Sequence, residues 1–184
     1  MISNDLVKNE KGMSIAEAVM AISVITIGLL GVSSLAIQNI QIKGVNRNYL
    51  IASMLAQEGI ELTRNIRDQN WLNIQNDPSD PSLAWDDWIT DGSVPPNAAT
   101  FTIDHTNTSA NPPDQTVDDI ADAGALLYVN DTDNFYTHNP AGATASIFRR
   151  LVSVLDYGDY LVVTVAVGWP KGEYVVETYL YNWR

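Results

Sequence analysis

An uninterrupted apolar run near the amino terminus constrains this chain more than any other feature. Residues 13–37 read MSIAEAVMAISVITIGLLGVSSLAI, and Glu17 is the only charged side chain among them. At about 1.5 Å per residue, a helix needs about 20 such residues to cross the hydrocarbon core of a bilayer. Gly28 and Gly31 would weaken this helix in water, by up to about 1 kcal/mol each, but glycine is common in membrane helices. The run predicts a membrane-spanning helix or an export signal.

The charge of the chain is concentrated in its middle. The 184 residues include 22 Asp and Glu against 10 Lys and Arg, for a formal net charge of −12. Between Asp68 and Arg149 there are twelve Asp and no Lys, Arg or Glu. Because this charge repels phosphate backbones, we expect no nucleic acid to bind the region after residue 70. With no Cys and only two His, the chain also lacks a thiolate nucleophile, disulfides and the side chains for a His-built metal centre.

The residues at the amino terminus leave two ordinary interpretations open. One is a secretory signal, because Lys8 and Lys11 precede the apolar run and Ser34-Leu35-Ala36 offers small residues for cleavage before Ile37. However, the apolar region of such a signal has about 7–15 residues, and this one is longer and contains a carboxylate. The other is a single-pass anchor, which accounts for the length but leaves Glu17 in the membrane at a cost of a few kcal/mol.

A third interpretation accounts for both the length and the carboxylate. The letters KG at 11–12 are followed by MSIAE at 13–17 and then by the apolar run. This pattern resembles the type IV prepilin signature, in which a short polar leader ends in Gly and a Glu lies four residues beyond the new amino terminus. The resemblance implies that a prepilin peptidase cuts between Gly12 and Met13 and methylates the amine of Met13. The family usually has Phe where Met13 stands and a larger apolar residue where Ala16 stands.

The same resemblance implies that Glu17 acts in filament assembly. A carboxylate within an apolar helix generally marks a functional position. In a filament, the amine of Met13 on one subunit would lie near Glu17 of a neighbour, and their mutual neutralisation would relieve the burial of both charges. Gly28 and Gly31 are where we expect the helix to unwind locally when it leaves the lipid.

The helix is expected to continue well beyond the membrane. No Pro occurs before Pro78, and residues 38–68 are amphipathic. A helix from residue 14 to residue 68 would be roughly 80 Å long. The residues expected to share its apolar face are Ile51, Met54, Leu55, Leu62 and Ile66. We therefore divide the chain into a cytoplasmic leader (1–12), a transmembrane or filament-core helix (13–37), the amphipathic half of that helix (38–70) and a globular head (71–184).

Part of the amphipathic half has a further resemblance. The segments AQEGIE at 56–61 and RNIRD at 64–68, followed by Asn70-Trp71, resemble minor pilins of the PilV type. From the residues alone, the charged side chains here are expected to form a solvated helix face with pairs worth about 0.2–0.5 kcal/mol each. These side chains are Glu58, Glu61, Arg64 and Arg67.

The remaining residues predict a β-rich head. Residues 71–100 are rich in turn signals, and we expect Trp85 and Trp88 to pack this loop onto the head rather than to bind a ligand. Alternating residues predict short strands at 101–104 and 126–130. Three strands joined by short turns follow, at 148–155, 160–169 and 173–183, and predict an antiparallel meander covered by the amphipathic helix. The predicted fold class is α+β, with a long amino-terminal helix packed on a carboxyl-terminal antiparallel sheet, as in type IV pilins.

Other candidate sites in the head are weaker. Asp131 and Asp133 alternate as in calcium loops, but the Gly and the distal Glu of an EF-hand are missing, so a solvated acidic surface is favoured over calcium. No feature brings Asp118, Asp119 and Asp122 together in a pocket, so they are not predicted to be catalytic. His105 and His138 are expected to be ordinary core or surface residues. Asn107-Thr108-Ser109 and Asn130-Asp131-Thr132 match a glycosylation pattern that is common by chance.

The sequence therefore predicts a structural subunit, without a cofactor and not an enzyme. It would be a minor pilin or pseudopilin, inserted in the cytoplasmic membrane with its head outside the cytoplasm and then assembled into an extracellular filament. Its partners would be prepilin peptidase, other pilin subunits and the pilus or secretion assembly machinery. The alternative is a secreted or membrane-anchored binding or adhesion domain that does not polymerise. The sequence does not separate a pilus from a competence filament or a secretion pseudopilus.

Overall fold

The computed structural model describes residues 12, 14–90, 92, 96–108 and 111–183. The chain divides into two units, Met1–Asn46 and Arg47–Arg184. Met13 and nearly all of the predicted leader lie outside the described residues.

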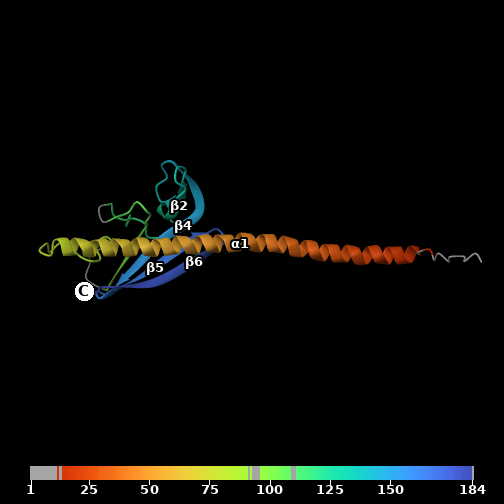
Figure 1. The fold of residues 1–184 in the computed structure, drawn as a ribbon, viewed down its shortest axis with the longest axis horizontal. Helices are drawn as coiled ribbons and strands as arrows, with labels where there is room; N and C mark the ends of the chain where they lie inside the picture. The colour runs from red at the N-terminus through yellow and green to blue at the C-terminus, as the bar shows by residue number, and fades with distance from the viewer. Residues whose placement is uncertain (1–11, 13, 91, 93–95, 109–110, 184) are drawn as a thin grey trace, which may run out of the picture. The chain divides into compact units, whose positions relative to one another are not determined.

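A single α-helix, α1, runs without interruption from Ile15 to Asn76 (Figure 1). In the first unit its apolar side chains are exposed around the whole circumference. This part is long and apolar enough to cross a membrane, by length and composition.

The helix continues about two turns beyond the predicted end at residue 68. Asn70 and Trp71 in these turns are buried, and the side-chain amide of Asn70 donates to the carbonyl oxygens of Asp87 (2.8 Å) and Trp85 (3.3 Å). These contacts hold the last turns against the following loop. The helix ends just before Asp77-Pro78, where proline disfavours a helical conformation of the preceding residue.

The second unit contains an antiparallel six-stranded sheet. Its order is β3-β2-β4-β5-β6, and β1 pairs with β4. One edge of β4 pairs with β2 near its start and with β1 near its end, while the other edge pairs with β5. The strands are β1 (Asn97–Phe101), β2 (Leu126–Asn130), β3 (Tyr136–Thr137), β4 (Ala143–Asp156), β5 (Tyr160–Trp169) and β6 (Gly172–Tyr181), with a short 3₁₀ helix, η1 (Ala123–Ala125), before β2.

The predicted meander of β4, β5 and β6 is confirmed, and so is the strand at 126–130. β6 occupies Gly172–Tyr181 instead of 173–183, and two other boundaries differ more. β4 begins at Ala143 instead of residue 148, because its first half pairs with β2. The first strand occupies Asn97–Phe101 instead of 101–104, and beyond it Thr102 forms only an isolated bridge to Asp114.

The core lies between the sheet and residues 52–66 of α1. Every second residue of β5 is buried, as the alternation predicts: Leu161, Val163, Val165, Val167 and Trp169. On the helix, Leu55 and Ile66 are buried as expected, but Met54 is 58% exposed, so its placement on the buried face was wrong. Trp85 packs against the core as predicted, whereas Trp88 is 47% exposed and does not.

Candidate functional site

The start of α1 is organised around two polar side chains. The hydroxyl oxygen of Ser14 accepts a hydrogen bond from the backbone N–H of Ala16 (3.3 Å), as a helix amino-terminal cap does. Glu17 lies in the first turn, where a carboxylate interacts favourably with the helix dipole. Its side chain is exposed, and among the described residues no cation pairs with it. The carboxylate of Glu17 is therefore free to meet a positive group supplied from outside the chain.

The two glycines of the apolar run lie within regular helix. A Cβ added at Gly28 or at Gly31 would have no neighbouring atom within 4 Å. Packing within this chain therefore does not require glycine at either position. Local unwinding in a filament stays a prediction, as does cleavage at Gly12, which is exposed and precedes the helix.

A buried arginine joins α1 to the sheet. Arg150, in β4, has no exposed surface. Its Nη1 donates to the carbonyl oxygen of Leu55 (3.0 Å) and to Oε2 of Glu58 (2.8 Å), and its Nη2 donates to the carbonyl oxygen of Ile103. Burial lowers the pKa of Arg150, and the carboxylate of Glu58 opposes that shift. The guanidinium thus ties the helix, β4 and the segment after β1 together.

This arrangement corrects the expectation that Glu58 belongs to a solvated face. Its carboxylate forms the ion pair with Arg150, while Glu61 pairs with Arg64 on the helix surface as expected. The signal that could have identified Arg150 is its position in the alternation, since it shares the inward parity of Phe148 and Val152.

Gly59 allows this close contact between helix and sheet. A Cβ at this position would lie 3.0 Å from Cγ1 of Val165 and 3.5 Å from Cδ of Arg150. Two adjacent residues of the AQEGIE segment therefore join the helix to the sheet: Glu58 forms the ion pair, and Gly59 allows the close approach.

A second polar group lies beside the arginine. The Asp104 carboxylate is buried and accepts hydrogen bonds from the hydroxyls of Thr106 and Thr137 (2.7 Å each) and from the backbone N–H of His138 (3.0 Å). Burial opposes ionisation, but these hydrogen bonds together outweigh it and lower the pKa of Asp104 to about 2.

His138 stays neutral for a related reason. The pKa of His138 is lowered to about 4, mainly by burial and also by the positive charge of Arg150. Its Nδ1 lies 3.0 Å from the carbonyl oxygen of Gly124, and its Nε2 is buried without a hydrogen-bond partner in the described part of the chain. We interpret Asp104, His138 and Arg150 as a structural cluster, because Asp104 and Arg150 are buried and bind backbone atoms of the head.

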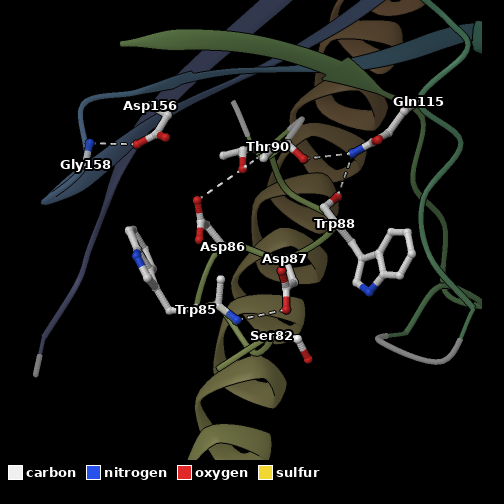
Figure 2. A pocket seen from close by; sticks show the side chains of 11 residues that line it. Ser82, Trp85, Asp86, Asp87, Trp88, Thr90, Gln115, Asp156 and Gly158 are labelled. Atoms are coloured by element: carbon white, nitrogen blue, oxygen red, sulfur yellow. Dashed lines mark hydrogen bonds between the residues drawn. The ribbon is translucent and has the colours of Figure 1, made fainter. Parts of the chain in front are cut away.

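A cavity in the head lies elsewhere (Figure 2). It measures about 570 Å³ and is lined by residues from the loop after α1, from the segment before η1 and from the β4–β5 turn. We call it the Trp–Asp pocket and define it by Ser82, Ala84, Trp85, Asp86, Asp87, Trp88, Thr90, Gly92, Gln115, Asp156 and Gly158. For its two tryptophans, the sequence interpretation favoured packing of the loop onto the head over ligand binding.

Hydrogen bonds fix the walls of the Trp–Asp pocket. The side-chain amide of Gln115 donates to the carbonyl oxygens of Trp88 (3.2 Å) and Thr90 (3.3 Å). Oδ1 of the buried Asp156 accepts from the backbone N–H of Gly158 (2.7 Å). Trp88 is held at φ 67°, a left-handed conformation that is uncommon for a bulky residue.

The weaker candidates are not brought together into a site. Oδ1 of Asp131 accepts from the Thr144 hydroxyl in β4 (2.9 Å), and Oδ1 of Asp133 accepts from the backbone N–H of Phe135 in its own loop (2.9 Å). Within the described ranges, no three His, Asp or Glu side chains are grouped so as to hold a metal ion. Asp118 accepts from Thr100, whereas Asp119 accepts from the backbone of Ala121. The ring of His105 lies at a tilt of 57° against that of Phe135, with the ring centroids 5.3 Å apart.

No protein-family model, curated protein or solved structure matches this chain. The resemblance to prepilins thus depends on the amino-terminal signature and on the AQEGIE segment.

Proposed function

We propose that this chain is a minor pilin or pseudopilin, a structural subunit that is cleaved between Gly12 and Met13 and polymerises through its amino-terminal helix. The observation that carries the proposal is the combination of two features of the first half of α1: its apolar side chains are exposed on all sides, and the carboxylate in its first turn pairs with no cation of the described residues. A helix that is apolar all round has to be buried in lipid or among other helices. A filament subunit would meet both surroundings: lipid before assembly, and the helices of neighbouring subunits after it.

The position of Glu17 supports assembly over simple anchoring. An anchor does not need a carboxylate at the edge of its span, where the charge weakens insertion. A neighbouring subunit that brings a positive amino terminus to Glu17 would neutralise both charges, and only the assembled state would gain this stabilisation.

The helix–sheet junction supports the same function mechanically. In the second unit, α1 is joined to the sheet by the Arg150–Glu58 ion pair and by the close approach at Gly59. A filament subunit needs such a junction, because force applied through the helix must reach the head without separating them.

The experiment that tests this function is the intact mass and amino-terminal sequence of the protein isolated from its native host. A chain that begins with N-methylated Met13 is the expected result. A chain that begins at Met1 would instead indicate a single-pass anchor, and one that begins at Ile37 would indicate a secreted domain. Either of these outcomes contradicts the proposal.

A further inference from the structure

The Trp–Asp pocket has the size and composition of a small-ligand site. Its volume of about 570 Å³ lies within the range of about 300–1,000 Å³ that is usual for ligand pockets. Such pockets combine aromatic walls with a few polar groups in fixed positions. Here the aromatic walls are Trp85 and Trp88, and the polar groups come mainly from Asp86, Asp87 and Gln115.

The two indole rings flank the acidic residues. In Figure 2 the ring of Trp85 lies on one side of Asp86 and Asp87, and the ring of Trp88 lies on the other. Trp85 packs partly against the core, which fixes it, whereas Trp88 is 47% exposed. An indole ring offers a flat apolar face and an N–H donor, so both tryptophans suit a ligand that has an apolar face and polar edges.

The polar groups present separate hydrogen-bond acceptors. Oδ2 of Asp86 accepts from the Thr90 hydroxyl (3.1 Å), and Oδ2 of Asp87 accepts from the backbone N–H of Ala84 (3.0 Å). Within the described residues, Oδ1 of each carboxylate accepts no hydrogen bond. Gln115 uses its amide N–H group to bind two carbonyl oxygens, which leaves its Oε1 as a third acceptor.

This distribution fits several hydroxyl donors better than one cation. A guanidinium or ammonium group is held best by carboxylates that converge on it. The carboxylates of Asp86 and Asp87 are instead anchored to different loop atoms, so their remaining oxygens are fixed at separate points. Sugar hydroxyls are spread around a ring in a comparable way, and O–H groups form short, strong hydrogen bonds to carboxylates.

The charge of the surrounding chain restricts the ligand further. No Lys or Arg occurs between residues 68 and 149, so the carboxylates of this region are not neutralised by neighbours in sequence. Because a pocket lined by one sign of charge repels ligands of that sign, sugars that carry carboxylates or sulfates are disfavoured.

We propose that the Trp–Asp pocket binds a neutral saccharide, which stacks on Trp88 and donates hydroxyl hydrogen bonds to Asp86, Asp87 and Gln115. The proposal does not depend on filament assembly, because all of these residues belong to one head. A monomeric chain that failed to polymerise would still bind.

Calorimetric titration of the full chain tests this proposal. The chain is purified in a polyoxyethylene detergent, since a detergent with a sugar headgroup would compete. The probes are cellotriose and triacetylchitotriose, which are neutral, trigalacturonate, which is acidic, and an acetylated, amidated Gly-Arg-Gly peptide, which is basic. We expect saturable binding of at least one neutral trisaccharide and none of trigalacturonate or the peptide.

Two variants locate the binding. Trp88→Gly removes the indole ring and suits the positive φ, and we expect it to weaken binding by about tenfold or more. Asp86→Asn keeps an acceptor for Thr90 but removes the charge, and it should also weaken binding. Trp183→Ala is the matched control, because Trp183 is an exposed indole that contacts Trp71 outside the pocket.

Three outcomes would overturn the saccharide assignment. The first is no heat of binding from either neutral trisaccharide. The second is binding of the Gly-Arg-Gly peptide that is lost in Asp86→Asn, which would reassign the pocket to a cationic ligand. The third is an equal loss of saccharide binding in Trp88→Gly and Trp183→Ala.

Discussion

Nη1 of Arg150 lies 2.8 Å from Oε2 of Glu58, and this ion pair joins β4 to α1 across 92 residues of sequence. The guanidinium is fully buried, while about a third of the Glu58 side chain is exposed. The pair is thus asymmetric. Removal of the carboxylate would leave a buried positive charge, whereas removal of the guanidinium would leave a carboxylate that water can reach.

We therefore expect Glu58→Ala to destabilise the head by about 3 kcal/mol, because an uncompensated buried charge is among the most destabilising single changes. Urea unfolding of the full chain in detergent, followed by tryptophan fluorescence, measures the change. Glu61→Ala is the control, since it breaks only the exposed pair with Arg64 and should change the free energy of unfolding by about 0.5 kcal/mol or less. Equal effects of the two variants would contradict the role assigned to Arg150.

Gly59→Ala should also destabilise the head, although alanine favours helices. The new Cβ would lie 3.0 Å from Cγ1 of Val165, so helix and sheet would have to separate slightly. We expect a net loss of about 1–2 kcal/mol, since overpacking outweighs the gain of about 1 kcal/mol in helix propensity. Gly44→Ala is the matched control, because no atom lies within 4 Å of its added Cβ, and it should leave the unfolding of the head unchanged. If the Gly59→Ala variant were as stable as the parent chain, the contact between the helix and Val165 would not be tight.

The stability of the head should decrease on acidification in two steps. Burial and Arg150 lower the pKa of His138 from 6.5 to about 4, so the unfolded chain binds more protons between these values. Stability from this group is complete above pH 6.5 and is lost as the pH falls to about 4, with an upper limit of about 3 kcal/mol. The pKa of Asp104 is lowered from 3.8 to about 2, so its contribution is lost at lower pH, between these two values.

The first of these steps can be isolated with His138→Asn. This variant does not titrate, and its amide can still donate to the carbonyl oxygen of Gly124. Urea unfolding at pH 7.5 and at pH 4.5 should therefore show a smaller loss of stability for His138→Asn than for the parent chain. His105→Asn, which changes an exposed histidine, should lose as much stability as the parent. If all three proteins lost the same amount, His138 would not be the group responsible.

The elements that were predicted well are those with a strong local pattern. The alternation of apolar residues in β5 and the length of the apolar run in α1 each identify an element without knowledge of its partners. Boundaries set by tertiary contacts were missed, since the last turns of α1 depend on Asn70 and a loop 15 to 17 residues away.

Site residues also divide into those recognisable from local sequence and those defined by tertiary contacts. The alternation in β4 places Arg150 on the inward face, but its partners, Glu58 and two carbonyl oxygens, come together only in the folded chain, so its role was missed. The Trp–Asp pocket was missed because Trp88, Gln115 and Asp156 come together only when the sheet is assembled. Glu17 could be proposed from the sequence because its surroundings, an apolar helix, are visible in the sequence itself.

The assembly role that we propose for Glu17 leads to the prediction that bears most directly on function. Glu17→Ala should insert into the membrane and be cleaved normally, but it should be incorporated poorly into filaments, because the amine of a neighbouring subunit would lose its partner at a cost of about 3 kcal/mol or more. Glu17→Gln, which keeps the size of the side chain without its charge, should show the same defect. The measurement is the fraction of the protein recovered in sheared filaments relative to the membrane, with the intact mass checked to establish normal processing.

The control for this experiment is Glu61→Gln, which neutralises an exposed carboxylate of the same helix outside the apolar run. It should be incorporated like the parent chain. If Glu17→Gln were incorporated normally while Glu17→Ala was not, the size of the side chain and not its charge would matter, and the pairing with the neighbouring amine would be wrong. Normal incorporation of both Glu17 variants would remove any assembly role for this residue, since an exposed carboxylate in the first turn of α1 would then serve only the helix dipole.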